Sequence, residues 1–174
     1  MIISDPNLLV VAGDIVGDAL RRLSRTGFAN KNAGHLVIMD FTRGFRPLPE
    51  GVTIEQIAKD DDLFNEHFDG LILVDRKYNG DGLWKPDYQY IARAKTILSG
   101  REQMETSMII DQYSLTIQPG DVAYSGGVWL DGLAGGFSGV EGENDEGLGW
   151  IAIAPIHADA QINADRTPES GFFS

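Results

Sequence analysis

The stretch that decides the fold is Val122-Ala-Tyr-Ser-Gly-Gly-Val-Trp-Leu-Asp-Gly-Leu-Ala-Gly-Gly-Phe-Ser-Gly-Val140. Two strand-like runs, residues 122–130 and 133–140, are separated by Asp131-Gly132. Asp-Gly favours a two-residue turn because both central positions of such a turn require a positive φ. The stretch therefore predicts an antiparallel β-hairpin.

Upstream of the hairpin, one helix and two strands follow from the pattern of apolar residues. Apolar side chains recur at helical spacing over residues 5–26, where Pro6 suits the first helical position and Gly27 ends the run. Residues 35–41 and 68–75 are short, apolar and rich in β-branched side chains. Both runs are typical of buried strands.

Three more helices and a loop complete the expected elements. Residues 53–65 open with the capping-box pattern Thr-x-x-Gln and predict a short acidic helix. Residues 76–86 are rich in Gly, Asn and Lys and predict a loop, after which residues 87–109 predict a helix. A last helix is expected over residues 144–154, ended by Pro155.

Length and composition favour one globular domain. A chain of 174 residues with 43% hydrophobic and 23% charged residues can bury a core of its own. We expect this domain to span residues 1–157, followed by an irregular tail over residues 158–174. Because there is no cysteine, disulfides, thiolate metal sites and a cysteine nucleophile are excluded.

The charge argues against nucleic acid as a partner. The formal net charge is −12, and the 14 Lys and Arg residues are scattered rather than clustered on a phosphate-binding face. The first residues lack the basic region and the small-residue cleavage site of a signal peptide, and no apolar run approaches the length of a membrane span. We therefore expect a cytoplasmic protein that binds neither nucleic acid nor membrane.

Glycine accumulates in the hairpin and in the turn after it. The positions are Gly126, Gly127, Gly135, Gly136, Gly139 and Gly142. Glycine weakens strands, so its presence indicates the close approach of a ligand or of another backbone. A series of bulges or tight packing against a helix explains the pattern equally well. No nucleotide-binding glycine motif occurs there.

Lys95 is the cation with the most interesting position. It lies on the apolar-facing side of its expected helix, where it could pair with a carboxylate or act as a base if burial lowers its pKa. Asp145 and Glu146 are the candidate partners. The alternative is that the lysine extends its ammonium group into solvent.

The histidines give no metal motif. Three are present, too widely spaced for a helical metal site. His35 begins an expected strand and His67 precedes another, and histidines at strand ends more often bond to the backbone than to a ligand. No metal site is expected.

Three sets of residues together resemble a known family. They are Asn32-Ala-Gly-His-Leu-Val37, then Ile91-Ala-Arg-Ala-Lys-Thr96 followed by Gly100-Arg101, and finally Ser125-Gly-Gly-Val with Asp131 to Gly139 and Asp145-Glu146. They are similar to motifs of the haem-degrading domain family typified by the GlcG and HbpS proteins and by the C-terminal domain of PduO. The likeness is closest in the second half of the chain.

The resemblance implies a fold, an assembly and a ligand. The fold is α+β, a single domain with a profilin-like antiparallel β-sheet flanked by α-helices, assembled into homo-oligomers. The ligand is haem or another small planar or carboxylate-bearing molecule, bound between the hairpin and the helix of Lys95. Lys95 or Arg93 would face a propionate, and His35 or His67 would be the axial ligand. The hairpin would contribute Gly126, Gly127, Gly135, Gly136, Ser138 and Gly139.

Two other functions remain open at this point. The same pocket would suit a cofactor-independent enzyme, such as a lyase, isomerase or cyclase of a secondary pathway, with Lys95 as cation or base and Asp145 or Glu146 as its partner. Alternatively, the domain is only an assembly subunit whose glycines pack between protomers.

Overall fold

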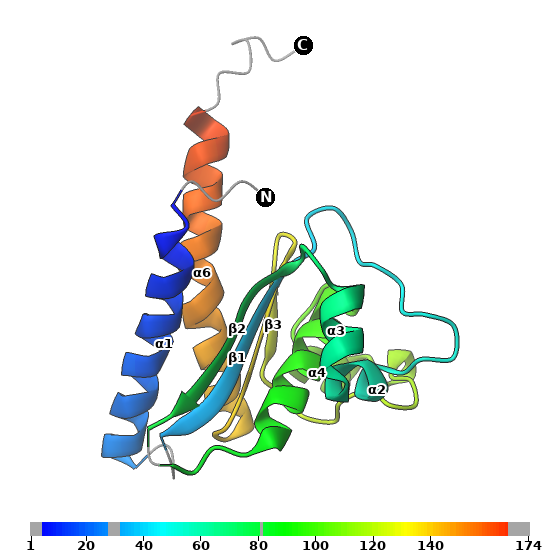
Figure 1. Ribbon diagram of the computed structural model, residues 1–174, viewed down its shortest axis with the longest axis horizontal. Helices are drawn as coiled ribbons and strands as arrows, with labels where there is room; N and C mark the ends of the chain where they lie inside the picture. Colours follow the sequence, from blue (N-terminus) through cyan, green and yellow to red (C-terminus); the bar gives the residue numbers. More distant parts are fainter. Residues whose placement is uncertain (1–4, 28–31, 81, 167–174) are drawn as a thin grey trace.

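A four-stranded antiparallel sheet forms the centre of the computed structural model, which describes residues 5–27, 32–80 and 82–166. The strands are β1 (Ala33–Asp40), β2 (Ile72–Asn79), β3 (Gly127–Leu130) and β4 (Leu133–Ser138), in the order β2-β1-β4-β3. Helices cover both faces of the sheet (Figure 1). The expected α+β arrangement is confirmed.

The helices form two layers. Helices α1 (Asn7–Thr26) and α6 (Gly142–Arg166) lie side by side on one face of the sheet (Figure 1). The other face is covered by α2 (Ile54–Lys59), α3 (Asp61–His67) and α4 (Pro86–Glu102). The chain then passes through α5 (Thr106–Gln112) and the short 3₁₀ helix η1 (Ser114–Thr116) before it reaches β3.

The predicted hairpin is confirmed at its turn. Strands β3 and β4 pair from Leu130 and Leu133, and the two residues between them, Asp131 and Gly132, have φ values of 45° and 92°. These are the positive values that the Asp-Gly pair predicts. The first strand is shorter than expected, because β3 begins only at Gly127; of the residues before it, Gly126 still accepts a hydrogen bond from the Phe137 amide of β4.

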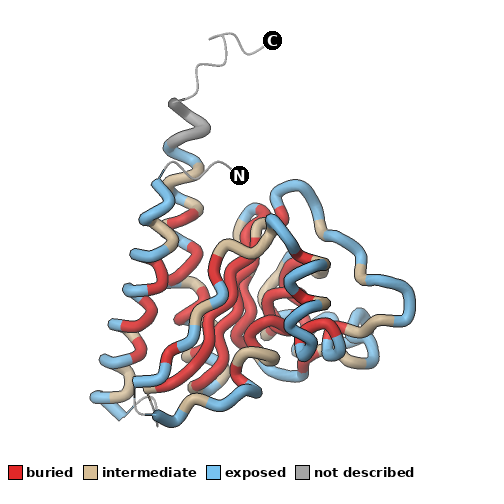
Figure 2. The backbone as a smooth tube through the Cα atoms, viewed as in Figure 1, coloured by how far each residue is buried: buried red, intermediate tan, exposed pale blue. Residues whose placement is uncertain are grey.

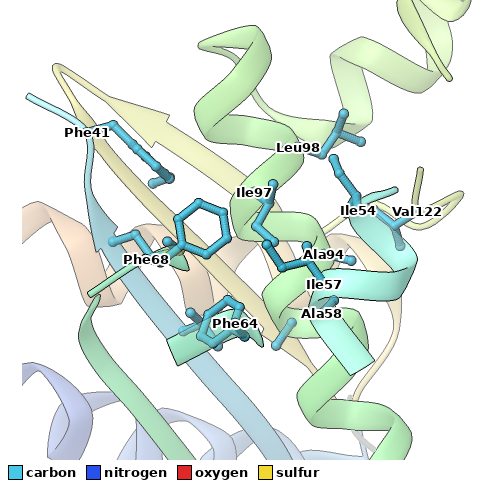
Figure 3. Close-up of a cluster of buried hydrophobic side chains, with 14 of the residues drawn as sticks. Phe41, Ile54, Ile57, Ala58, Phe64, Phe68, Ala94, Ile97, Leu98 and Val122 are labelled. Carbon is cyan, nitrogen blue, oxygen red and sulfur yellow. The ribbon is translucent and has the colours of Figure 1, made fainter. Parts of the chain in front are cut away.

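Two apolar cores lie on opposite faces of the sheet. Along β1, Leu36 and Ile38 pack toward α1 and α6, whereas Val37 and Met39 pack toward α2, α3 and α4. This central strand therefore has no polar face, and Figure 2 shows it buried along almost its whole length. Figure 3 shows part of the second core, in which Phe64 and Phe68 contact each other beside α4.

The glycines of the hairpin allow the helices to approach the sheet closely. A Cβ atom at Gly136 would lie 2.4 Å from the Ala92 carbonyl oxygen of α4, and one at Gly127 would lie 2.7 Å from the Lys95 carbonyl oxygen. On the other face, a Cβ at Gly135 would lie 2.7 Å from a methyl carbon of Ile153 in α6. Tight packing against helices thus explains these three glycines.

Two of the expected helices are each divided into two. The helix expected over residues 53–65 is broken at Asp60, whose side chain accepts a hydrogen bond from the Leu63 amide and caps α3. The expected capping box of Thr53 and Gln56 is confirmed. The helix expected over residues 87–109 ends at Glu102, because Gln103 takes a left-handed conformation with φ 57°.

The second strand lies further along the chain than expected. Residues 68–71 form a turn in which Gly70 has φ 73°, and β2 then runs to Asn79 through residues expected to form a loop. Contacts with α1 explain this shift. The Tyr78 hydroxyl donates to the Gly13 carbonyl, and Arg76 donates to Asp14.

The last helix is longer than expected. Helix α6 continues through Pro155 to Arg166, so residues 158–166 are helical and the expected irregular tail is wrong there. Ala152, Ile153 and Ile156 are fully buried around the proline, and burial of such side chains offsets the roughly 3 kcal/mol that a proline costs inside a helix. The rest of the expected tail, residues 167–174, lies outside the described residues.

No helix in the described part of the chain has both the length and the apolarity needed to cross a membrane.

Candidate functional site

A pocket of about 420 Å³ opens beside Lys95. It lies between α4, the segment before β3, the end of β4 and the start of α6. Its lining is Tyr88, Ile91, Lys95, Ala123, Tyr124, Ser125, Ser138, Gly139, Val140, Gly142 and Asp145. We call it the polar pocket, because hydroxyl groups and one ion pair make up much of its wall.

The ion pair joins Lys95 and Asp145. The Lys95 Nζ atom lies 2.7 Å from Asp145 Oδ2 and also donates to the Phe137 carbonyl oxygen at 2.9 Å. Lys95 is only 1% exposed and pairs with Asp145, so the alternative in which it extends its ammonium group into solvent is wrong. The third N–H of the ammonium group has no acceptor among the described residues.

Asp145 is held in place by the backbone on either side of it. It lies in the first turn of α6, and its Oδ1 atom accepts a hydrogen bond from the Val140 amide at 2.9 Å. Gly126 leaves the space in which the pair meets, since a Cβ there would lie 2.6 Å from Asp145 Cβ and 2.7 Å from Lys95 Nζ. The site therefore depends on one glycine and on the turn between β4 and α6.

Burial lowers the pKa of Lys95 below its ordinary value, although the charges of Asp145 and Glu146 act in the opposite direction. An amine in this position gives up its proton more readily than a lysine in water. Glu146 therefore influences the site through its charge, although it does not line the polar pocket. Chemically, the pair can donate a hydrogen bond to a ligand oxygen or exchange a proton with it.

A second buried polar network contains His35 and Arg93. His35 Nε2 donates to Asp75 Oδ1, and Arg93 donates to the other oxygen of the same carboxylate at 2.8 Å. Arg93 also contacts Asp61 at 2.5 Å and stacks over Phe64. Burial acts to raise the pKa of Asp75, but the hydrogen bonds from His35 and Arg93 lower it overall. Neither His35 nor Arg93 lines the polar pocket.

His35 nevertheless borders the polar pocket through its neighbour in the sheet. It pairs directly with Ser138 of β4, which lines the pocket. Its Nδ1 atom is buried and has no hydrogen-bond partner among the described residues, and the same holds for Nε1 of Trp84, whose ring centroid lies 6.3 Å from that of His35. Only Ser138 therefore separates His35, a member of the second network, from the polar pocket.

His67 is not brought to either site. It ends α3, its ring packs edge-on against Phe68 with centroids 4.6 Å apart, and its carbonyl accepts a hydrogen bond from Arg46. Phe68 in turn contacts Phe41, which follows the far end of β1 from His35. The two histidines named as axial ligands therefore lie at opposite ends of the central strand.

Some of the site residues predicted from the sequence lie together at the polar pocket. Lys95, Asp145, Ser138 and Gly139 line it, and Gly126 lies beside the ion pair. The remaining glycines of the hairpin, Gly127, Gly135 and Gly136, contact helices instead.

Two groups of lining residues were missed as site residues. Tyr88 and Ile91 precede Lys95 by seven and four positions, and this helical spacing was visible in the sequence. Tyr124 and Ser125 also line the pocket, but they lie in the part of the hairpin stretch that was expected to be strand. No local signal separates that part from β3.

Comparisons with protein families, with curated proteins and with solved structures found no match for this chain.

Proposed function

We propose that the protein binds a small organic molecule in the polar pocket, between the hairpin and α4. One observation carries the proposal: a lysine that is 1% exposed lines the pocket and keeps one N–H donor without an acceptor among the described residues. Buried donors are almost always paired. A ligand oxygen in the polar pocket would complete the hydrogen bonding of Lys95.

The size and chemistry of the polar pocket support this proposal. A volume of about 420 Å³ lies in the range of small-molecule sites, roughly 300–1,000 Å³. Such sites are mostly apolar with a few polar groups that orient the ligand. Here Ile91, Ala123 and Val140 supply apolar surface, while Lys95 and Ser138 supply polar groups.

Haem does not fit these residues as well as a smaller ligand does. An axial ligand to iron needs a side chain that reaches the pocket, yet neither His35 nor His67 lines it. Nε2 of His35 is occupied by Asp75, and His67 lies at the other end of β1. Of the two ligand classes that the resemblance implies, we therefore propose the small molecule rather than haem.

Native mass spectrometry of the purified protein tests the proposal. We expect the wild-type protein to carry, or to take up from a metabolite panel, a small molecule that the double variant Lys95→Met/Asp145→Leu does not retain. Lys85→Met is the matched control, because Lys85 is exposed and does not line the polar pocket. Equal retention by all three proteins, or no ligand on the wild type, would contradict the proposal.

A proton-transfer enzyme is the second candidate function. It is favoured by the lowered pKa of Lys95 and by the carboxylate 2.7 Å from its amine, which together can move a proton on a bound substrate. A lyase, isomerase or cyclase without a cofactor could use this amine and carboxylate as its acid and base. Once a ligand is known, Lys95→Met should abolish turnover, and the wild-type rate should rise with pH as the amine loses its proton. A fully active Lys95→Met variant would exclude this function.

Assembly and location complete the proposal. We propose a homo-oligomer, as the resemblance to the GlcG and HbpS family implies, and a cytoplasmic location. The exposed apolar side chains Val10, Val11 and Ile15 of α1 and Ile151 of α6 offer a surface for another copy. Sedimentation velocity tests the assembly, and a monomer at all concentrations would contradict it. Fractionation of cells that express the tagged protein tests the location.

A further inference from the structure

We infer that the ligand is a neutral, elongated molecule, with a carbonyl or hydroxyl oxygen at Lys95 and an apolar body in an adjoining pocket. The inference rests on the proposed function, because it assigns a ligand class to the same site. It goes beyond that function by assigning a second pocket in which no expected site residue lies.

The adjoining pocket has a volume of about 490 Å³ and lies between α2, α4 and the segment before β3. Its lining is Glu55, Ala58, Lys59, Asp87, Tyr90, Ile91, Ala94, Gly120, Asp121, Val122, Ala123 and Tyr124. We call it the apolar pocket. Ile91, Ala123 and Tyr124 line both pockets, so the two pockets adjoin, and we call them together the groove.

Helix α4 explains how the two pockets adjoin. At 100° per residue, Asp87, Tyr90 and Ala94 fall on one stripe of the helix and line only the apolar pocket. Tyr88 and Lys95 fall on the neighbouring stripe and line only the polar pocket. Ile91 lies between the stripes, where a ligand would pass from one pocket to the other.

The floor of the apolar pocket is made of small side chains that belong to the core. Ala58 of α2, Ala94 of α4 and Val122 are each buried. Figure 3 shows Ala58 and Ala94 together where α2 packs against α4. Alanine side chains leave a volume that leucine or phenylalanine side chains would fill. The apolar pocket therefore has space for the apolar part of a ligand. The hydrophobic effect would favour a ligand body placed there.

The charges along the groove favour a neutral ligand. Two lysines line it, Lys59 and Lys95, and each already pairs with a carboxylate. Four carboxylates line it: Glu55 and Asp145 are the partners of these lysines, Asp121 pairs with Arg101, and Asp87 leaves a negative excess of one. An anionic head would meet this negative excess, and a cationic head would be repelled by the Lys95 ammonium. A carbonyl or hydroxyl oxygen accepts the remaining N–H of Lys95 without either cost.

Tyr124 marks the junction of the two pockets at the surface. It lines both, and 61% of its surface is exposed. A large aromatic side chain left open to water beside two pockets is a contact that an apolar ligand would bury.

NMR titration with methyl n-alkyl ketones from butanone to decanone tests the inference on the wild-type protein. Amides of Ser125, Val140 and Gly142 report on the polar pocket alone, and those of Gly120 and Val122 on the apolar pocket alone. We expect butanone to shift the first set only and decanone to shift both. Affinity should rise along the series by up to about fourfold per methylene.

A substitution in the floor of the apolar pocket tests whether the ligand body lies there. Ala94→Leu fills the apolar pocket, so the gain in affinity along the ketone series should disappear while butanone binds as before. Ala154→Leu, on the exposed side of α6, should leave the whole series unchanged. Thermal unfolding of both variants shows whether Ala94→Leu keeps the fold, and if it does not, the wild-type titration decides alone.

The possible failures are distinguishable. If decanone shifts only the amides of the polar pocket, or if affinity does not depend on chain length, the second pocket is not part of the site and the inference is overturned. If no ketone shifts the amides of the polar pocket, the inference is overturned, while the proposed function is contradicted only if the native mass spectrometry also shows no ligand that depends on Lys95 and Asp145.

Discussion

Asp145 connects three parts of the chain at the scale of a single residue. Its carboxylate accepts hydrogen bonds from Lys95 of α4 and from the Val140 amide, while its backbone lies in the first turn of α6. Because both members of the ion pair are almost fully buried, each depends on the other to compensate the loss of water. The pair is therefore part of the structure as well as part of the proposed site.

Removing one member of this pair should destabilise the protein strongly. We expect Lys95→Met to lower the free energy of unfolding by about 3–5 kcal/mol, because Asp145 would remain as an uncompensated buried charge. Lys95→Met/Asp145→Leu should recover most of the loss, and Lys59→Met on the surface should change little. Urea unfolding measures all three. A mild effect of the single variant would show that the carboxylate reaches water.

The network around Asp75 should make stability depend on acid pH. The pKa of this carboxyl is lowered in the folded protein, so its stabilising effect is complete above the ordinary value of 3.8 and is lost as pH falls through the lowered pKa. We expect Asp75→Asn to be less stable than wild type at neutral pH, because Arg93 loses one of its two carboxylate partners and His35 loses its own, and to lose less stability on acidification below about pH 4. Urea midpoints across this range, with exposed Asp69→Asn as control, check the prediction.

The candidate site could be predicted from the sequence only in part, and the individual residues show why. Lys95 was identifiable from its place on the apolar side of a helix, and Asp145 from its place at the start of another. Their contact was not predictable in detail, because it depends on the left-handed glycine at position 126 and on the path of the turn after β4. The partner of His35 was not predictable either, since Asp75 lies forty positions away on a strand whose register no local pattern fixes.

At the scale of the elements, the contact between α4 and the hairpin depends on glycine. Gly136→Ala should lower the free energy of unfolding by about 1–3 kcal/mol or more, because its Cβ would lie 2.4 Å from a backbone carbonyl that cannot move without the helix. Gly147→Ala in α6 is the matched control: apart from its chain neighbours and the adjoining backbone of α6, no atom of the described residues lies within 4 Å of its Cβ position, so helix propensity should raise stability by about 0.5–1 kcal/mol. Thermal unfolding compares the two, and equal effects would contradict the packing explanation.

Pro155 should cost stability even though α6 tolerates it. We expect Pro155→Ala to raise the free energy of unfolding by about 1–3 kcal/mol, since it removes the clash of the ring with the preceding turn and restores one backbone hydrogen bond. Calorimetry measures the change. A variant no more stable than wild type would indicate that the helix gains nothing from a regular turn at this point.

The elements with strong local signals were predicted well and those with tertiary causes were not. The Asp-Gly turn, the capping box of α2 and the apolar β1 follow from neighbouring residues. The continuation of α6 past Pro155 follows instead from burial against α1 and the sheet, and the shift of β2 follows from the contacts of Tyr78 and Arg76 with α1. Such contacts join distant parts of the chain, and no local window contains them.

At the scale of the whole molecule, charge opposes compactness. With 26 acidic against 14 basic residues, the folded chain holds a net charge of −12 within a small volume, and this self-repulsion favours unfolding. We expect the midpoint of thermal unfolding to rise as sodium chloride increases from about 0.01 to 0.2 M, because the screening length falls over this range. A midpoint that falls with salt would mean that surface ion pairs outweigh the repulsion.

The pairing of the first and last helices has a consequence for how the protein is made. The face of the sheet that carries Leu36 and Ile38 is closed by α6 as well as by α1. In a nascent chain, this apolar face of the sheet therefore stays exposed to solvent until Ile153 and Ile156 of α6 have emerged from the ribosome. Over this interval the incomplete domain exposes an apolar surface that chaperones bind, and productive folding waits until α6 has been translated.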